Sequence, residues 1–395
     1  MKSKVVLSEI ADINPRISKE TLGNNQKLVA FVSMASVTTN GTVYSGEERK
    51  LIEVSKGYTF FQKGDVLLAK ITPCFENGKA AVVSGLSHDI GFGSTEFHVL
   101  RPKKDVDVRY LFHQVWNPAF RFHGVKNMTG TAGQKRLPTD FLKRFTVYLP
   151  PLPEQKRIAA ILDKADGIRK KREEALQLAD SFLRATFLEM FGDPVTNPKG
   201  WEKGLLGENC EIITGFPFKS NLYQDSGVRL CRGANVMPER IDWSDSACWK
   251  NADNKIQSKY NLKSGDIVLA MDRPWISSGL KVALIQEEDC PSFLVQRVSR
   301  LRGIKGMNNE YLYNLILHPA FTHYCNPRKT ETTIPHISTN DIKLFEIPLP
   351  SQELLNKFKK IVNRIENTKK IFNSSKVVST NLFNSLTQRA FRGEL

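Results

Sequence analysis

The polar segment 129–136, with the sequence TGTAGQKR, has residue types that bind phosphate groups. Gly130 and Gly133 let a backbone approach an anion closely, because glycine has no side chain and accepts conformations that other residues avoid. Lys135 and Arg136 add positive charge next to them, and threonine hydroxyls suit phosphate oxygens. A lone loop of this kind is usually just solvated. Its meaning therefore depends on whether the chain contains others.

Comparable polar segments stand at matching places in the two halves of the chain. Arg, Lys, Gln and Asn side chains can contact base edges, while Thr, Ser and Lys suit phosphate oxygens. We therefore expect these segments to form a nucleic-acid interface. The candidate DNA-binding residues are Lys70, Thr72, Asn77, Lys79, Thr129, Thr131, Gln134, Lys135 and Arg136 in the first half, and Lys219, Arg232, Asn235, Arg273, Trp275, Ser277, Lys329, Thr330, Thr332, Thr333 and His336 in the second.

No catalytic motif accompanies these segments. The sequence has no Gly-x-x-x-x-Gly-Lys-[Ser/Thr] loop for ATP, no His-Glu-x-x-His and no nucleophile elbow. The segment 117–120 (NPAF) superficially resembles the loop that holds the target amine in adenine methyltransferases, but its counterpart 318–321 (HPAF) lacks the asparagine. We interpret both as prolines at helix ends. The six cysteines are scattered without metal-ligand spacing. We expect no catalytic site, metal or cofactor in this chain.

The charge balance favours a polyanionic partner. The net charge is +16, with an excess of eight positive charges in residues 1–150 (21 Lys and Arg against 13 Asp and Glu) and of six in residues 351–395 (9 against 3). Such a balance favours nucleic acid over membrane, with solubility alone as the simpler alternative. No apolar run approaches the length of a membrane span, and the N-terminus lacks a signal peptide. We expect a cytoplasmic location and no membrane partner.

The elements that would position these loops occur twice. The segment 264–270 (SGDIVLA) restates 63–69 (KGDVLLA), and 310–313 (EYLY) parallels 109–112 (RYLF). Further matches follow at a spacing close to 200 residues, and each copy ends at a long helical pattern. This is a duplicated unit of globular domain plus helix. The predicted boundaries are 1–149 and 196–347 for the globular domains, and 150–195 and 348–395 for the helical regions.

Both helical regions carry one apolar stripe. Apolar residues recur at steps of three and four from Ile158 to Met190, and again from Leu354 to Ala390. This spacing predicts two long helices that pack on a partner helix. Two duplicated units can pair their helices antiparallel with approximate two-fold symmetry. A helical hairpin that only joins two domains is the alternative.

At this point the residues show a family resemblance. The stretch LPPLPEQKRIAAILDKADGIRKKREEALQLADSFLRATFLEMFGDP resembles the central region of the specificity subunit of type I restriction–modification systems. The C-terminal SLTQRAFRGEL resembles the end of that family's distal region, and the WEKGLLGENCEIITG, GDVLLAK and GDIVLAM segments also fit. The resemblance covers essentially the whole chain and is most specific in the two helices. One departure is the segment 351–353 (SQE), which has no Glu-Gln pair matching Glu154 and Gln155.

The resemblance implies an α/β (α+β) fold. Two strand-rich target-recognition domains, related by a pseudo-two-fold axis, would be separated by an antiparallel coiled coil of the two long helices. It also implies that each domain reads one half of a bipartite site in double-stranded DNA. The chain would then be a non-catalytic recognition subunit. A stand-alone DNA-binding or architectural protein is one alternative, and a self-sufficient methyltransferase is another.

The resemblance further implies partner proteins. Two methyltransferase (modification) subunits would dock on the helices and bring S-adenosylmethionine to methylate adenine. Where a restriction subunit exists, it would add ATP- and Mg-dependent cleavage, so these cofactors belong to the partners. The apolar helix ends and the arginines beside the second one are the candidate partner-binding residues, with capping of the domain cores as the alternative role: Phe187, Met190, Phe191, Leu386, Arg389, Phe391 and Arg392.

Overall fold

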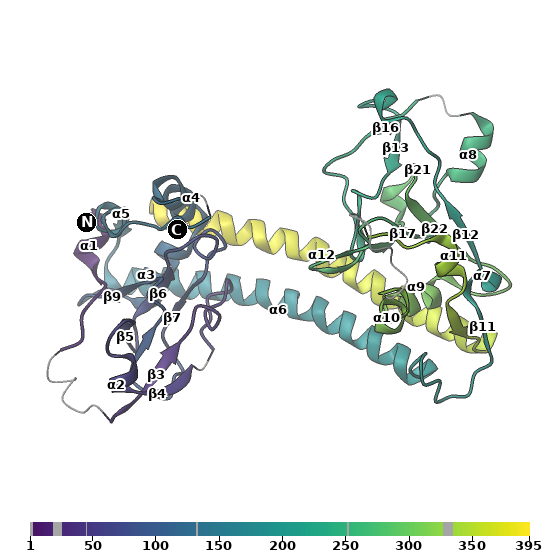
Figure 1. Ribbon diagram of the computed structural model, residues 1–395. Coiled ribbons are helices and arrows are strands. Elements are labelled where there is room, and N and C mark those ends of the chain that lie inside the picture. The colour runs from purple at the N-terminus through teal and green to yellow at the C-terminus, as the bar shows by residue number, and fades with distance from the viewer. Residues whose placement is uncertain (1–2, 19–25, 45, 132, 251–252, 327–334) are drawn as a thin grey trace. The chain divides into compact units, whose positions relative to one another are not determined.

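The chain forms two compact units, each with its own part of the two long helices (Figure 1). The computed structural model describes residues 3–18, 26–44, 46–131, 133–250, 253–326 and 335–395. Unit 1 consists of Met1–Ala175 and Phe372–Leu395, and unit 2 consists of Leu176–Ile371. The first helix, α6 (Leu152–Phe191), has 40 residues, and the second, α12 (Gln352–Arg392), has 41. The two predicted long helices are therefore confirmed.

Unit 1 is built on two four-stranded sheets. One has the order β2-β9-β6-β7 and is antiparallel, and the other has the order β4-β3-β8-β5 with one parallel pair, β3 and β8. The strands are β1 (Ser3–Val6), β2 (Ala11–Ile13), β3 (Leu28–Val32), β4 (Glu47–Lys50), β5 (Thr59–Gln62), β6 (Val66–Ala69), β7 (Ala80–Val82), β8 (Ile90–Gly93), β9 (Phe97–Pro102) and β10 (Thr146–Leu149). The helices besides α6 and α12 are α1 (Leu7–Ile10), α2 (Leu51–Val54), α3 (Val108–Trp116), α4 (Pro118–Asn127) and α5 (Thr139–Arg144).

Strand β6 shows why this sequence forms a central strand. All four of its residues are buried, and successive side chains point to opposite faces of the sheet. Val66 and Leu68 therefore join the core that contains α3 and both long helices, whereas Leu67 packs with Val32 and Phe61 on the other side. A run of four apolar residues is what a strand buried on both faces requires.

Unit 2 repeats the first sheet of unit 1. Its order β12-β22-β17-β20 matches β2-β9-β6-β7 strand for strand, and β17 alternates between two cores as β6 does. The strands are β11 (Lys203–Leu205), β12 (Cys210–Thr214), β13 (Val228–Cys231), β14 (Val236–Met237), β15 (Arg240–Ile241), β16 (Cys248–Trp249), β17 (Ile267–Ala270), β18 (Trp275–Ile276), β19 (Gly279–Leu280), β20 (Val282–Leu284), β21 (Ser292–Leu294), β22 (Val298–Gly303) and β23 (Glu346–Pro348). The helices are α7 (Leu206–Asn209), α8 (Asn254–Tyr260), α9 (Asn309–Leu317), α10 (Pro319–Cys325) and α11 (Thr339–Lys343), with 3₁₀ turns η2 (Ser220–Leu222) and η3 (Glu287–Asp289).

The long helices run antiparallel inside each unit. In unit 2, Lys369 pairs with Asp180 at 2.8 Å, and the rings of Phe358 and Phe191 lie 5.1 Å apart. Residue numbers therefore rise along α6 in the direction in which they fall along α12. In unit 1, Lys376 pairs with Glu173 at 3.2 Å. Arg172, the polar residue on the apolar stripe of α6, donates to the carbonyl of Ser375 at 2.6 Å in the same unit. The duplicated fold of two strand-rich domains and a coiled coil is thus present.

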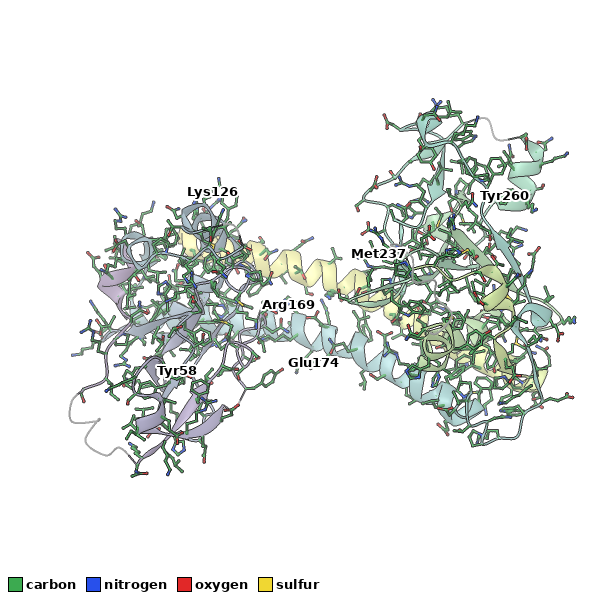
Figure 2. The ribbon with its side chains drawn as sticks, in the orientation of Figure 1. Tyr58, Lys126, Arg169, Glu174, Met237 and Tyr260 are labelled. Atoms are coloured by element: carbon green, nitrogen blue, oxygen red, sulfur yellow. The ribbon has the colours of Figure 1, made fainter. Side chains whose placement is uncertain are left out.

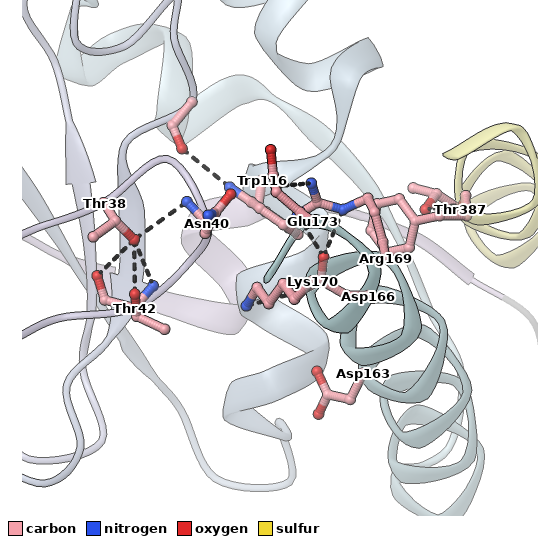
Figure 3. Close-up of polar contacts among 12 residues, drawn as sticks. Thr38, Asn40, Thr42, Trp116, Asp163, Asp166, Arg169, Lys170, Glu173 and Thr387 are labelled. Atoms are coloured by element: carbon pink, nitrogen blue, oxygen red, sulfur yellow. Dashed lines mark hydrogen bonds and ion pairs between the residues drawn. The ribbon is translucent and has the colours of Figure 1, made fainter. Parts of the chain in front are cut away.

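A cluster of charged side chains on α6 is linked by ion pairs within the helix. Asp166 is buried and bound by Arg169 and Lys170, each at 2.8 Å, one helical turn further on (Figure 3). Pairs at these spacings share a helix face and stabilise the helix. Throughout the described ranges, every helix is too short or too polar to cross a lipid bilayer.

Candidate nucleic-acid interface

The two polar loops of unit 1 lie against each other. The Thr72 amide donates to the carbonyl of Lys135 at 2.9 Å, and the Leu137 amide donates to the carbonyl of Lys70 at 2.8 Å. A β-bridge between Ile71 and Arg136 lies between these bonds. Contacts between residues more than 60 positions apart in the sequence therefore join two segments into one surface, which we call the unit 1 loop pair (70–79 with 129–136).

Unit 2 makes the same connection at the equivalent residues. The Arg273 amide donates to the carbonyl of Pro335 at 2.9 Å, and the Ile337 amide donates to the carbonyl of Met271 at 3.0 Å. Asp272 and His336 form the matching β-bridge. We call this surface the unit 2 loop pair (271–279 with 335–337). The two halves of the chain thus present polar loops on the same scaffold in the same way.

Within the unit 1 loop pair, some side chains are free and others are engaged. Arg136 binds Glu96 at 2.8 Å, Lys79 donates to the carbonyl of Met34 at 3.0 Å, and Thr72 contacts Glu76 at 3.5 Å. The others are exposed or half-buried, and in the described part of the chain their side chains have no hydrogen bond or ion pair. These are Lys70, Asn77, Thr129, Thr131, Gln134 and Lys135. This second group can contact a ligand without breaking an internal bond.

The backbone of this loop requires its glycine at position 130. Gly130 has a φ of 122°, which L-residues rarely adopt, and a side chain there would come within 2.8 Å of the Gln134 carbonyl. Gly133 is also left-handed, at 84°. Both glycines thus hold conformations that other residues rarely adopt, and the expected close approach of this backbone to phosphate stays a prediction.

Beneath the loop, a buried histidine acts as a neutral hydrogen-bonding link. His98 Nε2 lies 2.8 Å from the carbonyl of Leu137, which can only accept, and Nδ1 lies 3.2 Å from the amide nitrogen of Asn14, which can only donate. The imidazole therefore carries its proton on Nε2. Burial lowers the pKa of His98 to about 4, since a charged ring would be poorly solvated there.

Among the unit 2 candidates, Asn235 has a structural role. Its side chain is only 1% exposed, and its amide donates to the carbonyls of Asp242 and Asp245 at 2.9 and 2.8 Å. The neighbouring Arg232 is half-buried and bound to the same turn, with an ion pair of 3.2 Å to Asp245. Asn235 is a correction to the list, because a buried, fully bonded amide cannot reach a base edge. Arg232 would have to leave its partners to do so.

The remaining unit 2 candidates divide in the same way. Lys219, Arg273 and Ser277 are exposed, and none of their side chains has a partner among the described residues. His336 binds Asp272 at 2.6 Å, and Trp275 donates to Thr322 at 3.3 Å, so both are engaged. Four further candidates lie outside the described residues: Lys329, Thr330, Thr332 and Thr333.

Two charged residues beside the loop pairs were missed. Glu96 in unit 1 and Arg297 in unit 2 are equivalent, since the amide of Lys70 donates to the Glu96 carbonyl and that of Met271 to the Arg297 carbonyl. Glu96 binds Arg136, and the hydrogen bond from Arg136 lowers the pKa of Glu96. In unit 2 the charges of this ion pair are exchanged, because the cation Arg297 lies 3.6 Å from the carboxylate of Asp272. The sequence contains a signal for this difference, because the residue just before β9 is Glu96 and the residue just before the equivalent strand β22 is Arg297.

Most of the proposed partner-binding residues lie in the domain cores. Phe187 and Phe191 are 3% and 1% exposed, stacked among Tyr311 and Phe358 in unit 2. These two are a correction, because side chains buried in the core present no surface to a partner. Met190 is partly buried on the same core, and Leu386 and Phe391 are partly buried on the core of unit 1. Arg389 and Arg392 are exposed.

The segment 117–120 is a helix start and makes no nucleotide site. Asn117 is buried and its side chain accepts from the amide of Phe120 at 2.8 Å, which caps α4 with Pro118 in the first turn. His318 caps α10 in the same manner. No group of three His, Cys, Asp or Glu side chains in the described ranges is arranged to hold a metal ion.

Comparison with known proteins gives the family. The model of the type I restriction modification DNA specificity domain matches residues 2–178 and again 198–375. The chain is 28% identical to the specificity subunit of the type I restriction enzyme EcoAI of Escherichia coli, over 97% of this chain and 81% of that protein. It is 41% identical to the EcoEI specificity subunit of Escherichia coli over 162 residues, which is 40% of this chain and 27% of that protein.

A solved structure shares the fold. The type I restriction-modification S subunit from M. genitalium aligns with a TM-score of 0.57 at 14% identity, over 99% of this chain and 96% of that chain. The two matched segments of the family model cover most of the sequence and fall one in each half of the duplication. The chain therefore belongs to the type I restriction–modification DNA specificity family.

Proposed function

We propose that the chain is the DNA-recognition subunit of a type I restriction–modification complex and that each of its loop pairs reads one half of a bipartite site. The observation that carries this proposal is the recurrence of the loop pair at equivalent residues of both units, with matching backbone hydrogen bonds. Exposed cations such as Lys135 and Arg273 supply phosphate or base contacts on each of them. The family membership and the net charge of +16 agree with a DNA partner.

In this proposal the chain supplies recognition and scaffold without catalysis. Methylation belongs to two modification subunits that carry S-adenosylmethionine, and ATP and Mg belong to a restriction subunit where the system has one. A cytoplasmic location, with access to chromosomal DNA, is part of the same proposal.

Exposed apolar side chains on the long helices support a scaffolding role. Aliphatic and aromatic groups on a helix are normally buried against another element, and exposed ones mark contact surfaces. In unit 1, Val377 and Val378 are 61% and 65% exposed on α12. In unit 2, Leu178 and Ile371 are 70% and 69% exposed. These residues, with Arg389 and Arg392, replace the buried phenylalanines as the proposed contacts for modification subunits.

The test is reconstitution with candidate modification subunits from the same host, followed by sequencing of the methylated sites. We expect two short specific segments separated by an unspecified gap. Replacing residues 1–150 by the domain of another family member should change one segment only. A change in both segments would contradict the assignment of one reader to each unit.

The same experiment separates the alternatives. A stand-alone DNA-binding protein would bind DNA but would not co-purify with modification subunits. A self-sufficient methyltransferase would bind S-adenosylmethionine as an isolated chain and would methylate DNA without partners.

A further inference from the structure

A cavity of about 690 Å³ opens in unit 2. Its walls come from the second half of α6, the middle of α12, helices α9 and α10, the β18–β19 hairpin and the turn that follows β14. Figure 2 marks Met237, the last residue of β14 before this turn. The apolar part of the lining includes Leu183, Phe187, Trp275 and Leu317. This volume is within the range of small-molecule sites, and an apolar lining with a few polar groups is typical of them.

The cavity exists because the two units are packed differently at equivalent positions. In unit 1, Trp116 stacks on Phe112 with ring centroids 5.1 Å apart, and its indole nitrogen donates to the carbonyl of Gly78 at 3.0 Å. The ring centroid of Phe383 lies 5.9 Å from that of Trp116. The repeat places Leu317 where unit 1 has Trp116, and Leu183 where unit 1 has Phe383. Smaller side chains at both positions leave the cavity open.

A tyrosine at the cavity wall has a hydroxyl group that keeps access to solvent. Tyr313, the equivalent of Phe112, lines the cavity and is only 9% exposed. Its hydroxyl makes no hydrogen bond to any described residue. This phenol stands where the other repeat has a phenylalanine, and its hydroxyl group can therefore bond to a ligand in the cavity.

The charges around this hydroxyl favour a cation. Asp180, Glu239 and Glu366 are close enough to raise the pKa of Tyr313, although burial is the larger cause. Lys369 pairs with Asp180 and Glu366 at 2.8 and 2.9 Å, so one cation serves two carboxylates. Arg184 is the other cation, and its ion pair with Glu239 is long, at 3.4 Å, and exposed. The cavity lining contains these three carboxylates and two cations, so the lining has a net negative charge. The whole chain, by contrast, has a net charge of +16.

Glu239 is held in place for such a ligand. It has a φ of 61°, an uncommon conformation for a residue other than glycine, and its amide donates to the carbonyl of Val282 at 2.9 Å. Strained backbone of this kind is often found at binding sites. An exposed ion pair contributes little to stability. An ammonium group of a ligand can therefore replace Arg184 as the partner of the Glu239 carboxylate.

We propose that this cavity binds a small organic cation, an ammonium group on an aromatic or aliphatic body. The body packs on Leu183, Phe187 and Leu317, the ammonium group lies against Glu239 and the Tyr313 hydroxyl, and the Trp275 and Tyr313 rings add cation–π attraction. The equivalent positions in unit 1 carry the larger Trp116 and Phe383 side chains, so the proposal concerns unit 2. The proposal is independent of DNA recognition.

The experiment uses the full chain and para-fluorophenethylammonium as the probe, followed by fluorine NMR. The uncharged para-fluorophenethyl alcohol has the same body without the charge. We expect the ammonium probe to bind about tenfold more tightly than the alcohol, because only the former can form a charge-assisted bond to Glu239. Absence of ammonium binding, or equal binding of the alcohol, would overturn the proposal.

Three variants locate the site. Glu239→Gln and Tyr313→Phe should each weaken binding of the ammonium probe about fivefold. Leu317→Trp should abolish it by filling the cavity as Trp116 does in unit 1. Glu346→Gln, an exposed carboxylate on β23 outside the cavity, is the matched control and should bind as the parent chain does. Undiminished binding in both Glu239→Gln and Tyr313→Phe, which preserve side-chain volume, would disprove the site even if Leu317→Trp fails to fold.

Discussion

Arg101 binds Asp65 through two hydrogen bonds of 2.9 Å, one from Nε and one from Nη2. The Asp65 side chain is 1% exposed and also accepts from the amide of Gln62 at 2.8 Å, which fixes the turn between β5 and β6. Unit 2 repeats the arrangement with Arg302 and Asp266 at 2.7 Å. The repeated Gly-Asp segment therefore anchors a tight turn to the neighbouring strand in both units.

Asp65→Ala should destabilise unit 1 by about 3 kcal/mol, because it leaves Arg101 without its partner and the turn without its acceptor. Urea unfolding measures the loss, and hydrogen exchange should show faster opening in β6 and β9 than in β17 and β22. Asp266→Ala should produce the reverse pattern. Equal effects on both units would contradict this local role.

The stability of unit 1 should decline as the pH falls below about 6.5, the ordinary pKa of histidine. Burial lowers the pKa of His98 to about 4, so the folded state releases a proton that the unfolded chain keeps between these values. The stabilising contribution is complete above pH 6.5 and is lost progressively towards pH 4, by about 3 kcal/mol in total. Thermal unfolding of the parent chain and of His98→Asn across this range provides the measurement. A parallel pH dependence in both proteins would exclude His98 as the cause.

Lys135→Ala should weaken DNA binding for all sequences and reduce the salt dependence of the affinity by about one unit, as expected for the loss of one phosphate contact. The side chain is exposed and has no partner among the residues that the structure describes, so folding should be unaffected. Fluorescence anisotropy at several salt concentrations gives the slope. Lys143→Ala, an exposed lysine on α5 outside the loop pair, is the matched control. An unchanged slope for Lys135→Ala would remove this residue from the interface.

Phe191→Ala should destabilise unit 2 by about 4 kcal/mol, because a fully buried ring packed on Tyr311 and Phe358 leaves a cavity. Arg392→Glu, at the exposed end of α12, should leave the unfolding midpoint unchanged and reduce co-purification of a modification subunit. Undiminished co-purification would rule out Arg392 as a docking residue. The pair of variants separates core packing from partner binding.

Much of the fold could be predicted from the sequence, because its signals are local or repeated. The three-and-four spacing of apolar residues on α6 and α12 follows from helix geometry alone. The repeated Gly-Asp turns followed by four apolar residues predict buried strands in the same way. The sequence also contained the polar loops, their glycines and the duplication that relates them.

The tertiary structure decided which polar side chains are available. Lys135 and Arg136 are neighbours with similar chemistry, yet of these two only Arg136 has a side-chain partner within the described ranges, because Glu96 from 40 residues away lies beside it. Asn235 resembles a base-reading residue in the sequence, but the fold surrounds it with the carbonyls of Asp242 and Asp245. The same holds for Phe187 and Phe191, whose burial depends on Tyr311 and Phe358.

The cavity of unit 2 could not have been found from the sequence. It depends on the absence of bulk where Trp116 and Phe383 of unit 1 meet, and these two residues come from separate parts of the chain. Sequence patterns specify which side chains are apolar and which elements they enter. Whether facing side chains fill the space between those elements depends on their combined volumes, and that is determined only when the chain is folded.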